Sequence, residues 1–153
     1  MRTTILAIAA ALAAATPALA NEARVEARGG AIWDGGTTEG IAGIALGYDW
    51  DLGQSTFAGL EVSGDKILTS GTKVAFGVTG RAGIKAGEAG KLYAATGYTT
   101  ETCDTCEDAW HLGAGYQHSF GGNVYGKVEY RHYFVGNGFS DPDAVVAGIG
   151  VKF

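Results

Sequence analysis

The chain has 153 residues, a formal net charge of −5, 26 glycines and only two prolines. Its mildly acidic balance, without clustered lysine or arginine, argues against nucleic acid as a partner. Beyond residue 20 the sequence contains neither a run of about 18 apolar residues nor a convincing amphipathic helix, so it predicts no membrane-spanning helix.

Residues 1–20 are typical of a bacterial secretory signal peptide. A basic start is followed by an apolar stretch rich in alanine and leucine, and Ala18-Leu-Ala20 forms a small-x-small cleavage site before Asn21. The alternative is an uncleaved membrane anchor, for which the apolar stretch is short. We therefore expect cleavage between Ala20 and Asn21, which would leave residues 21–153 as a single exported domain.

Eight segments of this domain alternate between apolar and polar residues, as β-strands with one apolar face do. In the last segment the apolar face runs from Val145 to Phe153 at every second position, and the opposite face carries Gly148, Gly150 and Lys152. The segments are of the length that a tilted strand needs to cross a bilayer, about 9–11 residues. In chain order, the predicted strands are centred on residues 24–33, 42–50, 58–63, 74–85, 92–99, 110–117, 124–131 and 144–153.

The segments between the predicted strands alternate in length. Short glycine-rich separators alternate with longer polar ones, and the first separator, residues 34–39, is intermediate. Short periplasmic turns that alternate with longer external loops are typical of outer-membrane barrels, and an even number of strands puts both termini in the periplasm. The short separators are residues 51–54, 86–90 and 119–123, and the longer ones are residues 64–73, 100–108 and 134–143.

Aromatic residues cluster toward the ends of the apolar faces. Tryptophan and tyrosine prefer the membrane interface, where the ring is buried and the polar atom stays hydrated. A soluble lipocalin-like barrel is the alternative, but there the apolar face would point inward and the charged face into water. The aromatic residues are Trp33, Tyr48, Trp50, Tyr98, Trp110, Tyr116, Tyr130 and Phe153, of which we expect Trp33, Trp50, Trp110, Tyr116 and Tyr130 to lie at the interfaces.

The hairpin and strand patterns at residues 45–53, 91–98, 125–131 and 145–153 resemble those of the small eight-stranded outer-membrane barrels, the group of opacity proteins and the transmembrane domain of outer-membrane protein A. The resemblance implies an eight-stranded antiparallel up-and-down transmembrane β-barrel in the outer membrane of a Gram-negative bacterium. Val151 and the terminal Phe153 resemble the signal that the barrel-assembly machinery reads. The resemblance also implies outer-membrane lipid, lipopolysaccharide and periplasmic chaperones as partners, and no cofactor.

The polar face of the strands carries charges that we expect inside the barrel. Eight strands enclose a space just wide enough for side chains, and buried charges must then pair. We expect a network that plugs the lumen, with Glu61 and Glu129 paired to Arg81 and Arg131 at its centre; a narrow or gated conduit is the alternative. The predicted lumen charges are Arg24, Glu26, Arg28, Glu61, Arg81, Lys85, Lys127, Glu129 and Arg131.

Cys103 and Cys106 form a CxxC pair in the third long separator. An oxidising envelope favours a loop disulfide. A zinc site would need four ligands and only His111 is close in sequence, whereas a redox thiol is typically found at a helix N-terminus. We favour the disulfide, and the metal and redox interpretations stay open.

An enzymatic function must be considered, because some eight-stranded barrels modify lipid A. His118 and Ser119 are adjacent and so face opposite sides of a strand, and no serine with a supporting acid is evident beside His111 or His132; Ser140 lies in the last long loop. The acids at 107, 108, 141 and 143 could attract a divalent cation, but their spacing matches no calcium loop.

We therefore expect a non-enzymatic outer-membrane protein with a structural or surface-interaction role, whose loops could meet an extracellular ligand. A narrow porin-like conduit for ions or small solutes is the alternative. A lipid A-modifying enzyme is the third hypothesis.

Overall fold

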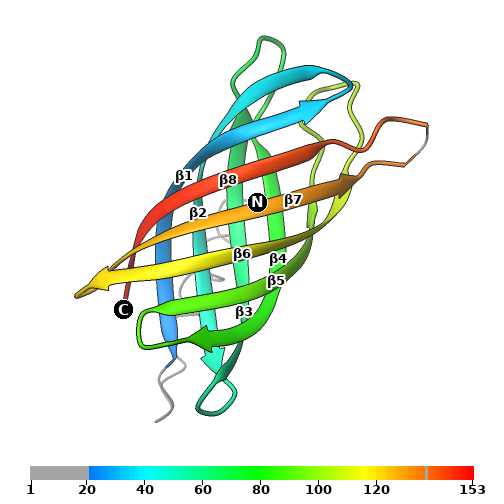
Figure 1. The fold of residues 1–153 in the computed structure, drawn as a ribbon. Helices are drawn as coiled ribbons and strands as arrows, with labels where there is room; N and C mark the ends of the chain where they lie inside the picture. Colours follow the sequence, from blue (N-terminus) through cyan, green and yellow to red (C-terminus); the bar gives the residue numbers. More distant parts are fainter. Residues whose placement is uncertain (1–20, 137) are drawn as a thin grey trace, which may run out of the picture.

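A computed structural model describes residues 21–136 and 138–153 as eight long β-strands (Figure 1). The predicted signal peptide and its cleavage at Ala20 lie outside the described residues. The strands are β1 (Glu22–Asp34), β2 (Thr37–Asp51), β3 (Thr56–Ile67), β4 (Ala75–Ala86), β5 (Gly90–Thr99), β6 (Ala109–Gly121), β7 (Val124–Phe134) and β8 (Asp143–Lys152).

The strands form one closed barrel in chain order, and every neighbouring pair is antiparallel. β1 closes the ring by pairing with β8, and Phe153 exchanges two backbone hydrogen bonds with Ala23, of 2.9 and 3.2 Å. Closure leaves no unpaired strand edge, which is what allows a sheet to sit in lipid. The predicted eight-stranded antiparallel up-and-down barrel is confirmed. Within the described part of the chain, no helix has the length and apolarity that crossing a bilayer requires.

The two ends of the barrel differ. The loop end carries the three longer connections, residues 68–74, 100–108 and 135–142, together with the β1–β2 turn. The turn end carries the three short connections and both ends of the described chain (Figure 1). Side chains at alternating positions of each strand point to opposite faces of the sheet, as predicted. One face points into the barrel and the other points away from it.

The outward face is apolar and exposed, and the inward face is polar and buried. Ile44, Leu112 and Ile149 are each more than half exposed on the outside, whereas Arg24 and Glu26 are almost fully buried inside. A soluble barrel would have the opposite arrangement, because water solvates charges and excludes apolar groups. This inversion is what a membrane-spanning barrel requires, and it excludes the lipocalin-like alternative.

The strand boundaries run beyond those predicted from side-chain alternation. Residues 34–39 are not a loop: β1 and β2 stay paired from Asp34↔Thr37 onward, and the turn itself is only Gly35 and Gly36, with φ of 51° and 95°. β3 continues to Ile67, and β6 continues to Gly121 through an irregularity after Ser119. Backbone pairing continues past the point where the side chains stop alternating, because hydrogen bonds need no apolar face.

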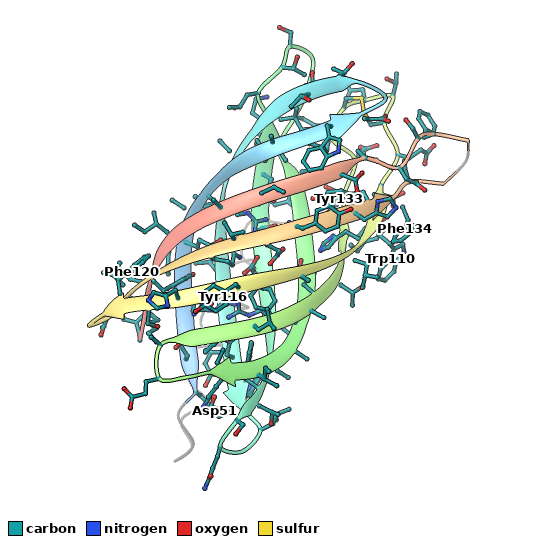
Figure 2. All side chains as sticks on the ribbon, viewed as in Figure 1. Asp51, Trp110, Tyr116, Phe120, Tyr133 and Phe134 are labelled. Atoms are coloured by element: carbon teal, nitrogen blue, oxygen red, sulfur yellow. A yellow bond between two sulfur atoms is a disulfide. The ribbon has the colours of Figure 1, made fainter. Side chains whose placement is uncertain are left out.

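The outward aromatic residues lie toward the two ends of the barrel. Trp33, Trp110 and Tyr130 are near the loop end, and Trp50 and Tyr116 are near the turn end. Figure 2 shows Trp110 beside Phe134 at one end and Tyr116 near Phe120 toward the other. The aromatic side chains also stack on one another: ring centroids are 5.1 Å apart in Tyr48–Trp50 and 5.5 Å apart in Tyr98–Trp110.

Candidate functional site

The middle of the barrel is filled by a layer of paired charges around Glu61. Its carboxylate, 3% exposed, accepts hydrogen bonds from Arg24 (3.3 Å), Arg28 (2.7 Å) and Lys127 (3.1 Å). A nitrogen of Arg131, Nη2, lies 3.7 Å from the same carboxylate, too far for a hydrogen bond. Glu61 therefore compensates cations from β1, two strands away along the ring, and from β7, directly across the barrel.

Two further carboxylates complete this central layer. Arg131 donates through Nε to Glu129, which also accepts a hydrogen bond of 2.7 Å from the Tyr93 hydroxyl. Glu26 lies 2.9 Å from the ammonium group of Lys127. Pairing of this kind is what permits charges to be buried, since an isolated buried ion costs several kcal/mol. The nearly fully buried side chains of the layer are Arg24, Glu26, Arg28, Glu61, Tyr93, Tyr125, Lys127, Glu129 and Arg131.

Arg81 pairs differently from the prediction. Its Nε and Nη2 donate to Asp49 at 3.0 and 2.5 Å, whereas the sequence predicted Glu61 or Glu129 as its partner. Lys91 also donates to Asp49, at 2.9 Å. The expectation was wrong because Arg81 and Asp49 lie in a separate layer nearer the turn end, and depth along the barrel depends on strand register, which one sequence does not show.

A glycine separates the partners in three of these ion pairs. Gly59 is paired with Asp49 on one side and with Arg81 on the other, and a Cβ at Gly59 would lie 2.2 Å from the Asp49 Oδ1. Gly47 separates Arg24 from Glu61 in the same way. The third separator is Gly43, between Arg28 and Asp65. A strand without a side chain at that level lets charges two strands apart meet across it.

The turn-end mouth is lined by charged residues. Lys85, predicted to lie in the lumen network, sits at this mouth with its side chain 29% exposed and donates to Asp51 at 2.5 Å. Glu22 accepts from Lys91 at 3.0 Å and lies 3.0 Å from the Lys152 ammonium group. These pairs close the network toward the turn end.

The loop-end mouth holds a cavity of about 140 Å³ with mostly apolar walls. Arg131 and Asp65 are among the residues that line it, and Arg28 holds the Asp65 carboxylate through two nitrogens. The lumen is therefore not polar throughout: its inward positions become apolar toward the loops. The lining side chains from the strands are Ile32, Ile41, Asp65, Ile67, Ala75, Thr99, Ala109, Arg131, Tyr133 and Val146.

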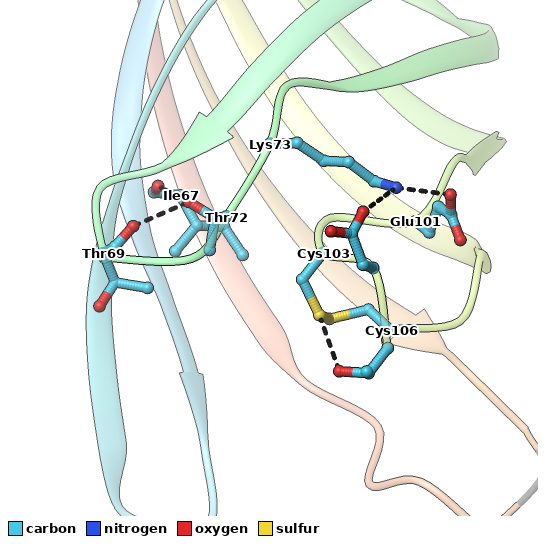
Figure 3. The surroundings of a disulfide bond; sticks show 9 residues. Ile67, Thr69, Thr72, Lys73, Glu101, Cys103 and Cys106 are labelled. Atoms are coloured by element: carbon cyan, nitrogen blue, oxygen red, sulfur yellow. Dashed lines mark hydrogen bonds and ion pairs between the residues drawn. A yellow bond between two sulfur atoms is a disulfide. The ribbon is translucent and has the colours of Figure 1, made fainter.

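Cys103 and Cys106 are joined by a disulfide in the loop between β5 and β6 (Figure 3). Lys73, from the loop between β3 and β4, reaches this loop and donates to Glu101 at 2.6 Å and to Asp104 at 3.2 Å. The hydrogen bond to Glu101, with the charges of both acids, raises the pKa of Lys73. The two loops are thus tied to each other at the loop end.

The three histidines occupy three different environments. His111 is buried in the lumen beside Thr79, 3.2 Å away, whereas His118 lies on the outer surface near the turn end, 3.3 Å from the Tyr116 hydroxyl. His132 lies at the loop-end rim, and its Nδ1 is 2.8 Å from Asp143. His132 therefore has an acidic partner, Asp143, that was not evident from the sequence.

Among residues 21–136 and 138–153, no nucleophile lies beside His132 and its acidic partner. Its ring packs edge-on against Phe134, with centroids 4.7 Å apart, and the hydroxyl of Ser140 donates to Asp34 instead. The acids that could have attracted a cation bind protein donors: Asp141 accepts from the backbone amide of Val135, and Asp143 accepts from Tyr130. In the described part of the chain, no group of three or more potential metal ligands is assembled.

Sequence reasoning missed Asp49, Asp65 and Lys91 as members of the network, and it missed the cavity. Asp49 stood on the polar face of its predicted strand but without an obvious partner. The cavity had a readable signal, because Ile32 and Ile41 fall at lumen-facing positions where the rest of the strand is charged or small.

The chain matches no protein-family model and no curated protein. Its fold is found among solved outer-membrane barrels. The outer membrane enzyme PagL superposes with a TM-score of 0.63 at 15% identity, over 84% of this chain and 98% of that one. Yersinia pestis Ail, in complex with the heparin analogue sucrose octasulfate, gives 0.58 at 14% identity (87% and 98%). Neisserial surface protein A gives 0.57 at 13% identity (87% and 97%). These likenesses confirm the fold of the small eight-stranded outer-membrane barrels.

Proposed function

We propose that this protein is a closed, non-enzymatic barrel of the Gram-negative outer membrane that acts at the cell surface through its loop end. The observation that carries the proposal is the central layer, in which charged side chains from β1, β3 and β7 are paired and at most 6% exposed. Water and ions would have to break several buried ion pairs to pass, and each such break is costly.

The orientation follows from the connections. In outer-membrane barrels the short turns face the periplasm and the longer loops face outward. The loop end would then present the disulfide loop, its Lys73 tether and the cavity to the medium. Trypsin added to intact cells tests this orientation, because Lys66 and Lys73 lie in or beside a loop that would be outside. Protection in intact cells, with cleavage only after the outer membrane is opened, would contradict it.

The charge of the loop end limits its partners. Residues 34–39, 66–74, 100–108 and 135–143 contain eight acids and two lysines, a net charge of 2 − 8 = −6. The Ail structure holds a polyanion, the heparin analogue. A polyanion would be repelled here, so the structure favours neutral or cationic partners for this protein.

Single-channel recording of the refolded barrel in a planar bilayer tests the closed lumen. The folded state is checked first by the difference in gel mobility between unheated and heated samples. We expect no discrete conductance steps from the folded protein. Steady discrete openings would overturn the closed barrel and favour the conduit instead.

The non-enzymatic part of the proposal rests on the surroundings of His132. Among the described residues its partners are Asp143 and Phe134, neither of which is a hydroxyl or thiol nucleophile. Mass spectrometry of lipid A from cells that overproduce the protein tests this directly. We expect unchanged acyl-chain composition, and loss or gain of one acyl chain would contradict the proposal.

A further inference from the structure

The loop-end cavity combines apolar walls with one unsatisfied donor. Arg131 lines the cavity and is 2% exposed, and its Nη2 has no hydrogen-bond partner. Three other buried side-chain atoms in the described part of the chain also lack a partner, on Arg24, Glu26 and Arg81, but none of those residues lines this cavity. The Arg131 Nη2 lies 3.7 Å from the Glu61 carboxylate, and a buried donor left unpaired is costly, so turning the guanidinium toward an acceptor atom in the cavity would be favourable.

The walls and floor define the shape of an occupant. Ile41, Ala75, Ala109 and Val146 are buried, point inward, and come from four different strands. A volume of about 140 Å³ is close to that of an engineered apolar cavity of about 150 Å³ that binds benzene. The occupant is therefore limited to roughly ten non-hydrogen atoms with an apolar body.

The charges around the cavity select the polar group of the occupant. Arg131 is already compensated by Glu129, so a ligand needs to bring an acceptor but not a negative charge. A carboxylate would be repelled by Asp65 and Glu107, which line the same cavity, and by the acidic loops. A cation would lie beside the Arg131 guanidinium and would leave its free N–H unsatisfied.

We propose that this cavity is a binding site for a small neutral molecule with an aromatic or branched apolar body and one amide or carbonyl group. The carbonyl oxygen accepts from Arg131, and the body packs on the isoleucine and alanine walls. An amide N–H is matched by the Asp65 or Glu107 carboxylate on the same walls. The site depends on the proposed function in one respect, because the closed central layer supplies its floor.

The chain carries its own reporters for a test. Ile32, Ile41 and Ile67 line the cavity, whereas the other isoleucines of the barrel lie on the lipid-facing surface, more than half exposed. The experiment labels the isoleucine δ1-methyl groups of the refolded protein with ¹³C and titrates three water-soluble probes of similar size. The probes are benzamide, benzoate and benzylammonium. The surface reporters are Ile44, Ile84 and Ile149.

We expect benzamide to shift the three cavity methyl signals with saturation at about millimolar concentration, while the surface methyl signals stay in place. Benzoate and benzylammonium should bind at least about tenfold more weakly. Shifts confined to the surface methyl signals would mean partition into lipid and would overturn the site. Tighter binding of benzoate or of benzylammonium would overturn the neutral-acceptor assignment.

Two substitutions on one strand provide the matched control. Ala109→Phe fills the cavity from its wall and should abolish the saturable shift, whereas Ala114→Phe adds the same ring to the lipid-facing side of β6 and should preserve it. Equal binding by both variants would contradict the location. Channel recordings of the same samples separate this result from the proposed function. A barrel that neither conducts nor binds benzamide refutes the site alone. A barrel that conducts refutes the closed lumen.

Discussion

Asp49 on β2 and Arg81 on β4 form a two-pronged ion pair across the intervening strand, with Nε–Oδ1 and Nη2–Oδ2 distances of 3.0 and 2.5 Å. They meet because Gly59 of β3 lies in register between them and carries no side chain. The same arrangement recurs at Gly47 and Gly43. The glycines of the lumen face are therefore part of the charge network, since they provide the room in which it forms.

Gly59→Ala should destabilise the barrel by about 1–3 kcal/mol, the usual cost of overpacking. Its new Cβ would lie 2.2 Å from Asp49 Oδ1 and 2.8 Å from the backbone oxygen of Tyr48, so both the ion pair and the strand must move. The measurement is the urea unfolding midpoint in lipid vesicles. Gly80→Ala is the matched control, because its Cβ would meet nothing closer than 3.8 Å. Equal midpoints for the two variants would refute the spacing role.

Asp49→Ala should cost about 3–5 kcal/mol of unfolding free energy, because it leaves Arg81 and Lys91 buried without their shared carboxylate. Asp104→Ala is the comparison. Its side chain is 97% exposed and its contact with Lys73 lies in solvent, so we expect no measurable change. Chemical denaturation of both variants measures their free energies of unfolding. An unchanged value for Asp49→Ala would mean that the turn-end layer does not stabilise the barrel.

Glu61→Ala should turn the silent barrel into a weak, anion-selective channel. The change removes the carboxylate that three cations share and leaves space beside Arg24, Arg28 and Lys127. Glu61→Gln, which removes the charge but keeps the volume, should open less often. The measurement is the reversal potential in a salt gradient across a planar bilayer; cation selectivity would show that the remaining carboxylates line the path instead.

Ala114→Arg should destabilise the folded barrel by about 2–4 kcal/mol, the cost of a cation on the lipid face near the bilayer centre. Ala114 points outward from the middle of β6, where it is paired with Ala94 and Tyr130. Thr38→Arg, at the loop-end tip of β2, should have little effect because the cation there reaches water. A loss of stability in Ala114→Arg as small as that in Thr38→Arg would mean that the apolar band does not face lipid.

Lys73→Ala should loosen the loop between β3 and β4, because Lys73 ties that loop to Glu101 and Asp104. Limited proteolysis of the refolded barrel measures the effect by mass spectrometry, using a protease that does not cut at lysine. Lys66→Ala is the matched control, since Lys66 bonds to Thr72 within its own loop region and does not reach the disulfide loop in the described structure. Equal cleavage of the two variants would contradict the tether.

The same tether has a defined pH dependence. Because the pKa of Lys73 is raised on folding, its stabilising contribution is complete below the ordinary lysine pKa and disappears as pH rises through the higher folded value. The ¹³Cε signal of Lys73 should therefore titrate above the reference value of about 10.4. Glu101→Gln should lower that midpoint. A midpoint at the reference value in the unmodified protein would show that the ion pairs do not persist in solution.

The sequence by itself determined the architecture, because alternation is a local property. The positions that face lipid and those that face the lumen follow from a two-residue period, and Val145, Ile149 and Phe153 show it without any knowledge of neighbours. The number of strands follows from the same count. Most of the predicted lumen charges, among them Glu61, Lys127 and Arg131, therefore occupy the buried positions expected for them.

Only the tertiary structure decided which charges pair and where the lumen stops being polar. Pairing depends on how far each strand is shifted against the next, so Arg81 meets Asp49 and Arg28 meets Asp65 across glycines that belong to other segments of the chain. The cavity arises in the same way, from inward apolar residues that closure of the ring brings to one level. Strand register is a property of neighbours, and no single strand encodes it.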